Sequence, residues 1–144
     1  MPYTLDSNAT KAANEYDKTL KKLLKSERNS DAVALFIRAV GVSDNQIQAM
    51  KRLPMWLGLE RMAPTLAYES EVLGKGHALP VALLSRITTP TLVMHGGAGA
   101  PFMRDAAKAI SQSIPKAEFR TLAGETHGVR PKVLAPVLID FFSR

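Results

Sequence analysis

The chain contains no cysteine among its 144 residues. Disulfide bonds and cysteine-ligated zinc sites are therefore excluded, and the composition fits a reducing cytoplasm. No apolar run reaches the roughly 18–20 residues that a membrane-spanning helix needs. The N-terminus also lacks the basic and apolar regions of a secretory signal peptide. We therefore expect a cytoplasmic protein that does not enter a membrane.

Motifs for metals and cofactors are missing as well. The three histidines have no grouped carboxylates and show none of the usual metal-ligand spacings. We expect His95, at the end of a strand, to turn to solvent or bond a backbone carbonyl, and His77 to lie in a loop among glycines. The glycine-rich segment Gly96–Gly99 is followed by no Lys-Ser/Thr pair, as a P-loop would require, and it lacks the Gly-x-Gly-x-x-Gly spacing of dinucleotide sites. We expect no metal and no cofactor, and we interpret these glycines as a strand-to-helix turn.

Basic residues outnumber acidic ones, 19 against 13, which gives a formal net charge of +6. The densest basic cluster runs from Lys18 to Arg28 and is interleaved with leucines, so it is typical of the solvated face of an amphipathic helix. Nucleic-acid binding is the alternative, but no aromatic platform or nucleic-acid module accompanies the cluster. We expect no nucleic-acid partner.

The N-terminal part of the sequence has helical patterning. Hydrophobic residues make up 46% of the chain and charged residues 22%, as in globular proteins, and the length suffices for a core of its own. Apolar residues at intervals of three and four predict helices. The capping candidates are Asp6 to Asn8, then Ser30 or Asp31, the capping-box pattern Ser43–Gln46, and Gly41 as a left-handed C-cap. The predicted helical segments are Ser7 to about Glu27, Ala32–Val40, Ser43 to Leu53, Thr65–Leu73 and, as a turn or two, Pro80–Arg86.

The pattern changes at Pro90. A short apolar strand, Thr91–His95, is followed by an amphipathic helix over Pro101–Ser113, a second strand over Ala117–Leu122 and a closing helix over Pro131–Phe142. Strand, helix, strand and helix with short links predict parallel pairing through a crossover. The chain is thus expected to be an α/β protein with a helical region, residues 1–86, and a βαβα unit, residues 87–144.

Three segments of this second part resemble the α/β-hydrolase superfamily: Ile87–Gly96, Ile114–Ala117 and Leu122–His127. In that family a proline-led strand carries the catalytic acid at its C-terminal end, and the loop after the next strand carries the catalytic histidine. The resemblance implies that residues 87–144 are the C-terminal portion of an α/β-hydrolase domain. The preceding helices then resemble the cap that many members insert ahead of this strand.

The catalytic groups are only partly present. The family's nucleophile sits in a Gly-x-Ser-x-Gly elbow, and the nearest segment, Gly41–Asn45, lacks the second glycine and is explained as a helix cap. The resemblance places the acid near Gly99, where no carboxylate occurs, and Asp105 lies inside the next helix. His127 alone matches the family pattern, and we take it as the candidate general base.

Apolar side chains suggest a binding surface. Thioethers adapt to irregular ligands, and the candidates for an apolar acyl pocket are Met55, Trp56, Met62, Phe102 and Met103. The alternative is that these residues pack the cap helices onto the sheet.

The resemblance implies a parent activity, hydrolysis of an ester or related acyl bond through a Ser-His-acid arrangement. A complete family member would carry about six more strands before the cap, so we expect a truncated gene product or half of a larger enzyme that is not competent alone. The alternative is a non-catalytic module whose apolar helical groove binds a small ligand or a protein. Because two strands cannot form a stable sheet, we expect self-association or a partner that supplies the missing strands.

Overall fold

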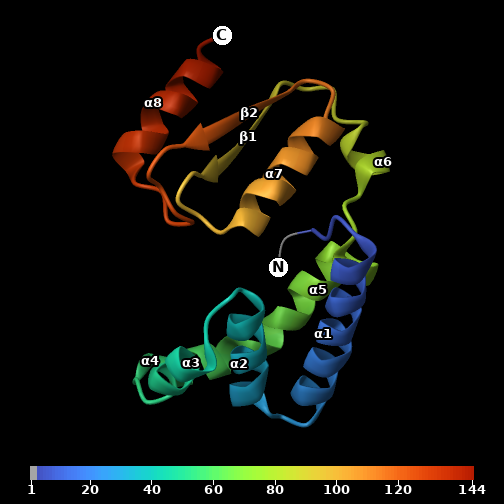
Figure 1. Cartoon of the computed structure of the whole chain (residues 1–144), viewed down its shortest axis with the longest axis vertical. Coiled ribbons are helices and arrows are strands. Elements are labelled where there is room, and N and C mark those ends of the chain that lie inside the picture. The colour runs from blue at the N-terminus through green and yellow to red at the C-terminus, as the bar shows by residue number, and fades with distance from the viewer. Residues whose placement is uncertain (1–2) are drawn as a thin grey trace. The chain divides into compact units, whose positions relative to one another are not determined.

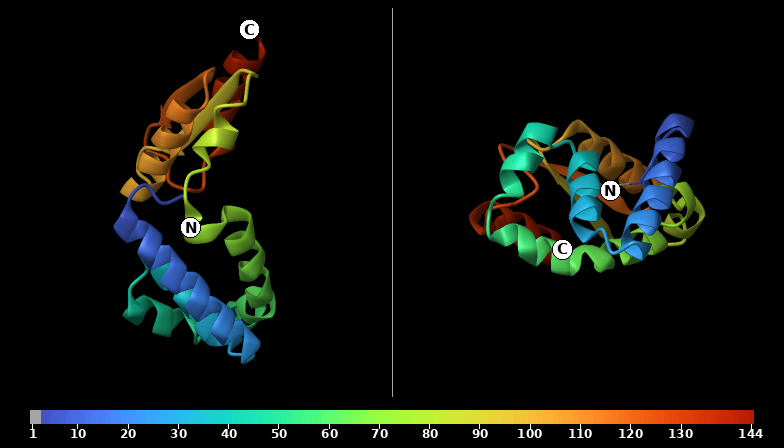
Figure 2. Two further views of the ribbon diagram at one scale, coloured as in Figure 1. Left: turned by 90° about the vertical axis from the view of Figure 1, so that its right-hand side faces the viewer. Right: turned by 90° about the horizontal axis from the view of Figure 1, so that it is seen from below.

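The computed structural model describes residues 3–144. The chain divides into two compact units, Tyr3–Ala78 and Leu79–Arg144 (Figure 1). The first is helical, as the views in Figure 2 show, and both strands belong to the second. Within the described residues, no helix combines the length and the apolar character that crossing a membrane requires. The predicted division into a cap-like region over residues 1–86 and a hydrolase-like portion over residues 87–144 stays a prediction.

The helical unit consists of five α-helices and two single 3₁₀ turns. They are α1 (Ser7–Lys25), α2 (Asn29–Ala39), α3 (Asp44–Met50), α4 (Met55–Met62), η1 (Ala63–Thr65), α5 (Leu66–Leu73) and η2 (Lys75–His77). The predicted capping signals are in place. The Asp6 carboxylate accepts the amides of Asn8 and Ala9, both at 2.8 Å, and Ser43 and Gln46 form the capping box of α3.

The start of α2 differs from the prediction. Ser30 or Asp31 was expected to cap a helix beginning at Ala32, but α2 begins at Asn29, and Arg28 at its N-cap makes no side-chain cap bond. Both candidate oxygens are otherwise engaged. Ser30 Oγ accepts the indole N–H of Trp56 at 2.8 Å, and Asp31 forms a 2.7 Å ion pair with Arg28.

Helices α1, α2, α3 and α4 and the turn η1 all contribute residues to the core of the helical unit. Its buried residues are Leu20, Ala32, Val33, Ala34, Ile37, Ile47, Trp56 and Ala63. Leu20 and Ile47 are fully buried. Burial of such side chains stabilises a fold by about 1.5–3 kcal/mol each, which explains why short helices such as α3 and α4 persist.

The second unit is the predicted α/β arrangement. It contains α6 (Val81–Leu84), β1 (Thr91–Gly96), α7 (Pro101–Ser113), β2 (Ala117–Leu122) and α8 (Pro131–Phe142). The strands pair in parallel, in a register that runs from Thr91 opposite Ala117 to Gly96 opposite Leu122. The parallel pairing is therefore confirmed. Helix α7 packs against both strands.

Ion pairs tie the C-terminal end of α8 to β2. Arg120 donates to Asp140 at 2.6 Å and to Glu118 at 3.2 Å. Arg144 pairs with Glu118 and, at 2.8 Å, with Asp140. The guanidinium groups of Arg120 and Arg144 lower the pKa of Asp140. No residue of α8 is fully buried, so charge pairing contributes to fixing this helix.

Candidate functional site

The loops that follow the two strands meet at one end of the sheet. Parallel strands place their C-terminal ends at the same edge, where ligand sites of α/β folds lie. The Gly97 amide donates to Leu122 O and the Ala98 amide to Glu125 O, both at 2.8 Å. The structure therefore brings the loop at the family's acid position against the loop that carries His127.

The contact between these loops depends on a glycine. A Cβ atom at Gly96 would lie 2.2 Å from Thr126 O and 2.4 Å from Glu125 O. Such distances leave no room for a side chain, so only glycine allows the end of β1 to pass this close to the His127 loop.

A buried carboxylate closes the base of the His127 loop. Glu125 is 2% exposed, and both of its carboxylate oxygens accept hydrogen bonds. Oε2 accepts the Arg130 amide at 2.8 Å, and Oε1 accepts Arg130 Nε at 2.7 Å and also Nη2. These bonds lower the pKa of Glu125. The bonds between Glu125 and Arg130 close a short loop, and His127 lies between these two residues.

His127 itself is exposed. Within residues 3–144 its imidazole forms no hydrogen bond to a hydroxyl or a carboxylate. Asp105 is partly exposed and pairs with Arg104 at 2.9 Å, while the Glu125 carboxylate is bonded to Arg130. A general base needs a nucleophile within about 2.6–3.2 Å and a group that orients it. The described residues bring neither to His127.

His95 is held in place by contacts within the sheet. Its Nε2 lies 2.8 Å from Thr121 Oγ1 and its Nδ1 lies 3.1 Å from Gly96 O. The ring stacks on Phe119, with 5.3 Å between centroids. Both nitrogens are therefore engaged within the sheet, including the expected bond to a backbone carbonyl.

His77 is a buried polar residue that sequence reasoning missed. It was expected in a loop among glycines, but it is 1% exposed and its Nε2 lies 3.0 Å from Asp17 Oδ1 of α1. Its φ of 53° is left-handed, which is uncommon outside glycine. Nδ1 has no hydrogen-bond partner among the described residues. Nearby, burial and the charges of Glu69 and Asp17 raise the pKa of Tyr16 to about 12.

The residues predicted to bind substrate divide between the units. On α4, Met55 and Met62 are exposed, whereas Trp56 is buried in the helical core and bonded to Ser30. On α7, Phe102 is exposed and Met103 is half-buried. Trp56 therefore has a structural role of its own. The joint role of the five as a substrate pocket stays a prediction.

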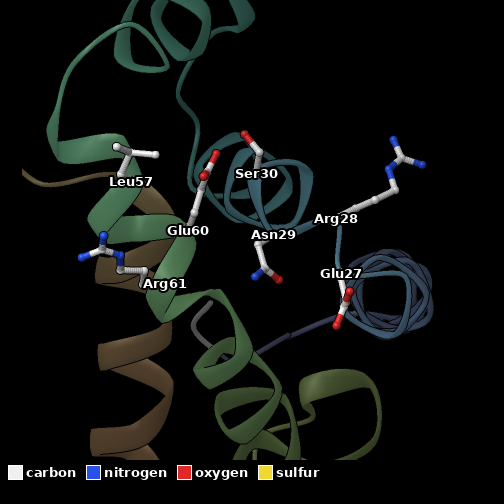
Figure 3. A pocket seen from close by; sticks show the side chains of 7 residues that line it. All are labelled: Glu27, Arg28, Asn29, Ser30, Leu57, Glu60 and Arg61. Carbon is white, nitrogen blue, oxygen red and sulfur yellow. The ribbon is translucent and has the colours of Figure 1, made fainter.

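A surface hollow of 390 Å³ lies where the junction of α1 and α2 faces α4 (Figure 3). Its lining residues are Glu27, Arg28, Asn29, Ser30, Leu57, Glu60 and Arg61. Only one of these is apolar, so the hollow is not the apolar groove that a non-catalytic ligand-binding module would use. Among residues 3–144 no cluster of three or more His, Asp or Glu side chains could hold a metal ion.

No protein-family model and no curated protein matches the sequence. Among solved structures, the chain is similar to the crystal structure of an alpha/beta hydrolase from Sphaerobacter thermophilus. The two share 37% sequence identity with a TM-score of 0.77, and the match covers 98% of this chain. The chain spans 55% of the length of that hydrolase.

Proposed function

We infer that this chain, which is a partial α/β-hydrolase, contributes the histidine loop and a helical cap to the hydrolysis of an ester-type bond and does not catalyse that reaction alone. The observation that supports the proposal is the His127 loop. It stands at the C-terminal edge of a parallel sheet, against the loop of the family's acid position, and it holds an exposed imidazole with no partner within residues 3–144.

The chemistry requires three groups. A serine hydroxyl attacks the acyl carbon, an imidazole takes the hydroxyl proton and returns it to the leaving group, and a carboxylate orients the imidazole. The 144 residues contain no Gly-x-Ser-x-Gly segment, and no carboxylate of residues 3–144 bonds to His127. We propose that His127 is the base and that the nucleophile comes from outside these residues.

The free edge of β1 is the proposed attachment point for further strands. The Thr91 amide donates to Lys116 O and the Gly97 amide to Leu122 O. Because parallel pairing alternates along a strand, the amides of Leu92 and Met94 point to the opposite edge. No described strand pairs there.

Such an edge is a template for another strand. Strand β1 carries no Lys, Arg, Asp or Glu, and charged residues are the usual means by which an edge is protected. We propose that a strand from another polypeptide segment pairs with β1, and that a second copy of the chain takes its place when that segment is absent.

Hydrolysis of short-chain aryl esters by the purified chain tests the catalytic part of this proposal. We expect the wild-type chain and His127→Ala to give the same rate as buffer, because the imidazole has no nucleophile to activate. His95→Gln is the matched control, since His95 is engaged within the sheet.

Turnover that survives in His95→Gln and disappears in His127→Ala would contradict the proposal. It would point to an internal nucleophile such as Thr126 beside the histidine. Ser85 is the other hydroxyl to test, although its Oγ is already bonded to Ala82 O at 3.2 Å.

A further inference from the structure

We propose that Glu125 is the positioning residue of the His127 loop, which it holds in place before any partner strand, nucleophile or substrate is present. The inference deepens the proposed function and rests on it, because it concerns the same histidine. It is carried by two independent attachments of one residue, the first through its carboxylate and the second through its main chain.

The carboxylate attaches the loop to the start of α8. Arg130 is the N-cap residue of this helix, and its amide and its guanidinium all donate to Glu125, as given above. A carboxylate that receives two guanidinium bonds has a fixed orientation, and such charge-assisted bonds are roughly twice as strong as neutral ones. The loop from Glu125 to Arg130 is therefore closed at its base.

The main chain attaches the same loop to β1. The Glu125 carbonyl accepts the Ala98 amide at 2.8 Å, and the absence of a side chain at Gly96 allows this approach. Glu125 thus links the ends of both strands and the start of α8 at one point, two residues before His127.

Glu125 is not the acid that would orient the imidazole. Both of its oxygens already accept hydrogen bonds from Arg130, and the side chain is buried whereas His127 is exposed. The carboxylate therefore acts on the loop and not on the ring. The bonds of Glu125 to Arg130 and Ala98 are called the Glu125 clamp. In a chain with no carboxylate at residues 96–100, this clamp provides the positional order that a catalytic base needs, since small displacements of such a group cost large factors in rate.

Backbone ¹⁵N relaxation of the full chain tests the inference. For residues 126–129 we expect order parameters of about 0.85 in the wild-type chain and below about 0.6 in Glu125→Ala. Glu125→Gln should lie between the two, because the amide oxygen can still accept the Arg130 N–H without the charge. Asp105→Ala is the matched control. It removes a partly exposed carboxylate from the same unit and should leave the loop unchanged.

Hydrogen exchange of the β1 and β2 amides separates positioning from general stability. The inference holds if loop order falls in Glu125→Ala and recovers in part in Glu125→Gln while strand exchange stays within about twofold of wild type. Unchanged loop order would overturn it, as would strand exchange that rises together with loop mobility. If Glu125→Ala does not fold, Arg130→Lys takes its place, because a lysine ammonium cannot reproduce the two bonds that Nε and Nη2 donate to Oε1. Arg130→Lys should then mobilise the loop, and an unchanged loop in this variant also overturns the inference.

The two proposals fail in different ways. Ester turnover by the isolated chain would contradict the proposed function and leave the loop measurements as they are. A His127 loop that is equally ordered in Glu125→Ala would contradict the role of Glu125. It would not change the conclusion drawn from the ester assay.

Discussion

Replacement of Asp17 by alanine should destabilise the helical unit far more than a half-buried carboxylate would suggest. The Asp17 side chain is 18% exposed, but its partner His77 is 1% exposed and depends on it for a hydrogen bond at 3.0 Å. The other ring nitrogen, Nδ1, has no partner in the described part of the chain. Asp17→Ala would therefore leave the whole buried imidazole without a hydrogen bond.

The magnitude follows from the cost of a buried polar group that has lost its partner. Removal of one partner of a buried hydrogen bond costs about 1–3 kcal/mol, toward the upper end where the partner is charged. For a unit of this size, 1 kcal/mol lowers the melting temperature by about 4–8 °C. We expect Asp17→Ala to lower the melting temperature of the helical unit by roughly 4–24 °C.

Tryptophan fluorescence gives a selective assay. The chain has one tryptophan, Trp56, and it is buried in the helical core, so its emission reports on that unit alone. Asp44→Ala is the control, because its 2.6 Å pair with Arg38 is exposed on both sides and exposed pairs contribute at most about 1 kcal/mol. If Asp17→Ala melts within about 2 °C of Asp44→Ala, the assignment of His77 as a dependent buried group is wrong.

Two pH predictions follow from the pKa shifts. The Tyr16 pKa is raised from 10.0 to about 12, so between these pH values the unfolded chain has released a proton that the folded unit retains. The stability of the helical unit should therefore fall as the pH rises over this range. Trp56 fluorescence would follow the fall, which should disappear in Tyr16→Phe. In the α/β unit, the pKa values of Glu125 and Asp140 are lowered from 4.5 and 3.8. The contribution of these carboxylates to the stability of the unit should be complete above about pH 4.5 and be lost as the pH falls below these values. Acid titration followed by amide exchange of the strands would show the loss.

Much of the fold could be predicted because its signals are local. Several signals depend on residues within one turn: the Asp6 cap, the Ser43–Gln46 capping box and the left-handed Gly41. The order of strands and helices after Pro90 implied parallel pairing. Local signals failed at α2, where Ser30 bonds to Trp56, which lies 26 residues away along the chain.

The site was predicted less completely. His127 was chosen as the candidate base because its segment resembles a family motif, and that role stays a prediction. The surroundings of His127 depend on contacts between segments that sequence patterns do not specify. Glu125 had no signal beyond a carboxylate five residues before Arg130. The contact between His77 and Asp17 joins residues 60 apart, and a histidine among glycines gives no sign that it is buried.

The central claim is that this chain is a partial α/β-hydrolase whose sheet needs another strand. The most direct test is light scattering coupled to size-exclusion chromatography at several protein concentrations. We expect a mass above that of one chain that rises with concentration, and a melting transition that depends on concentration in the same way. Met94→Pro removes an edge-facing N–H without removing a bond to β2, so it should reduce the association. A wild-type chain that stays monomeric at every concentration, with one sharp and concentration-independent transition, would contradict the account.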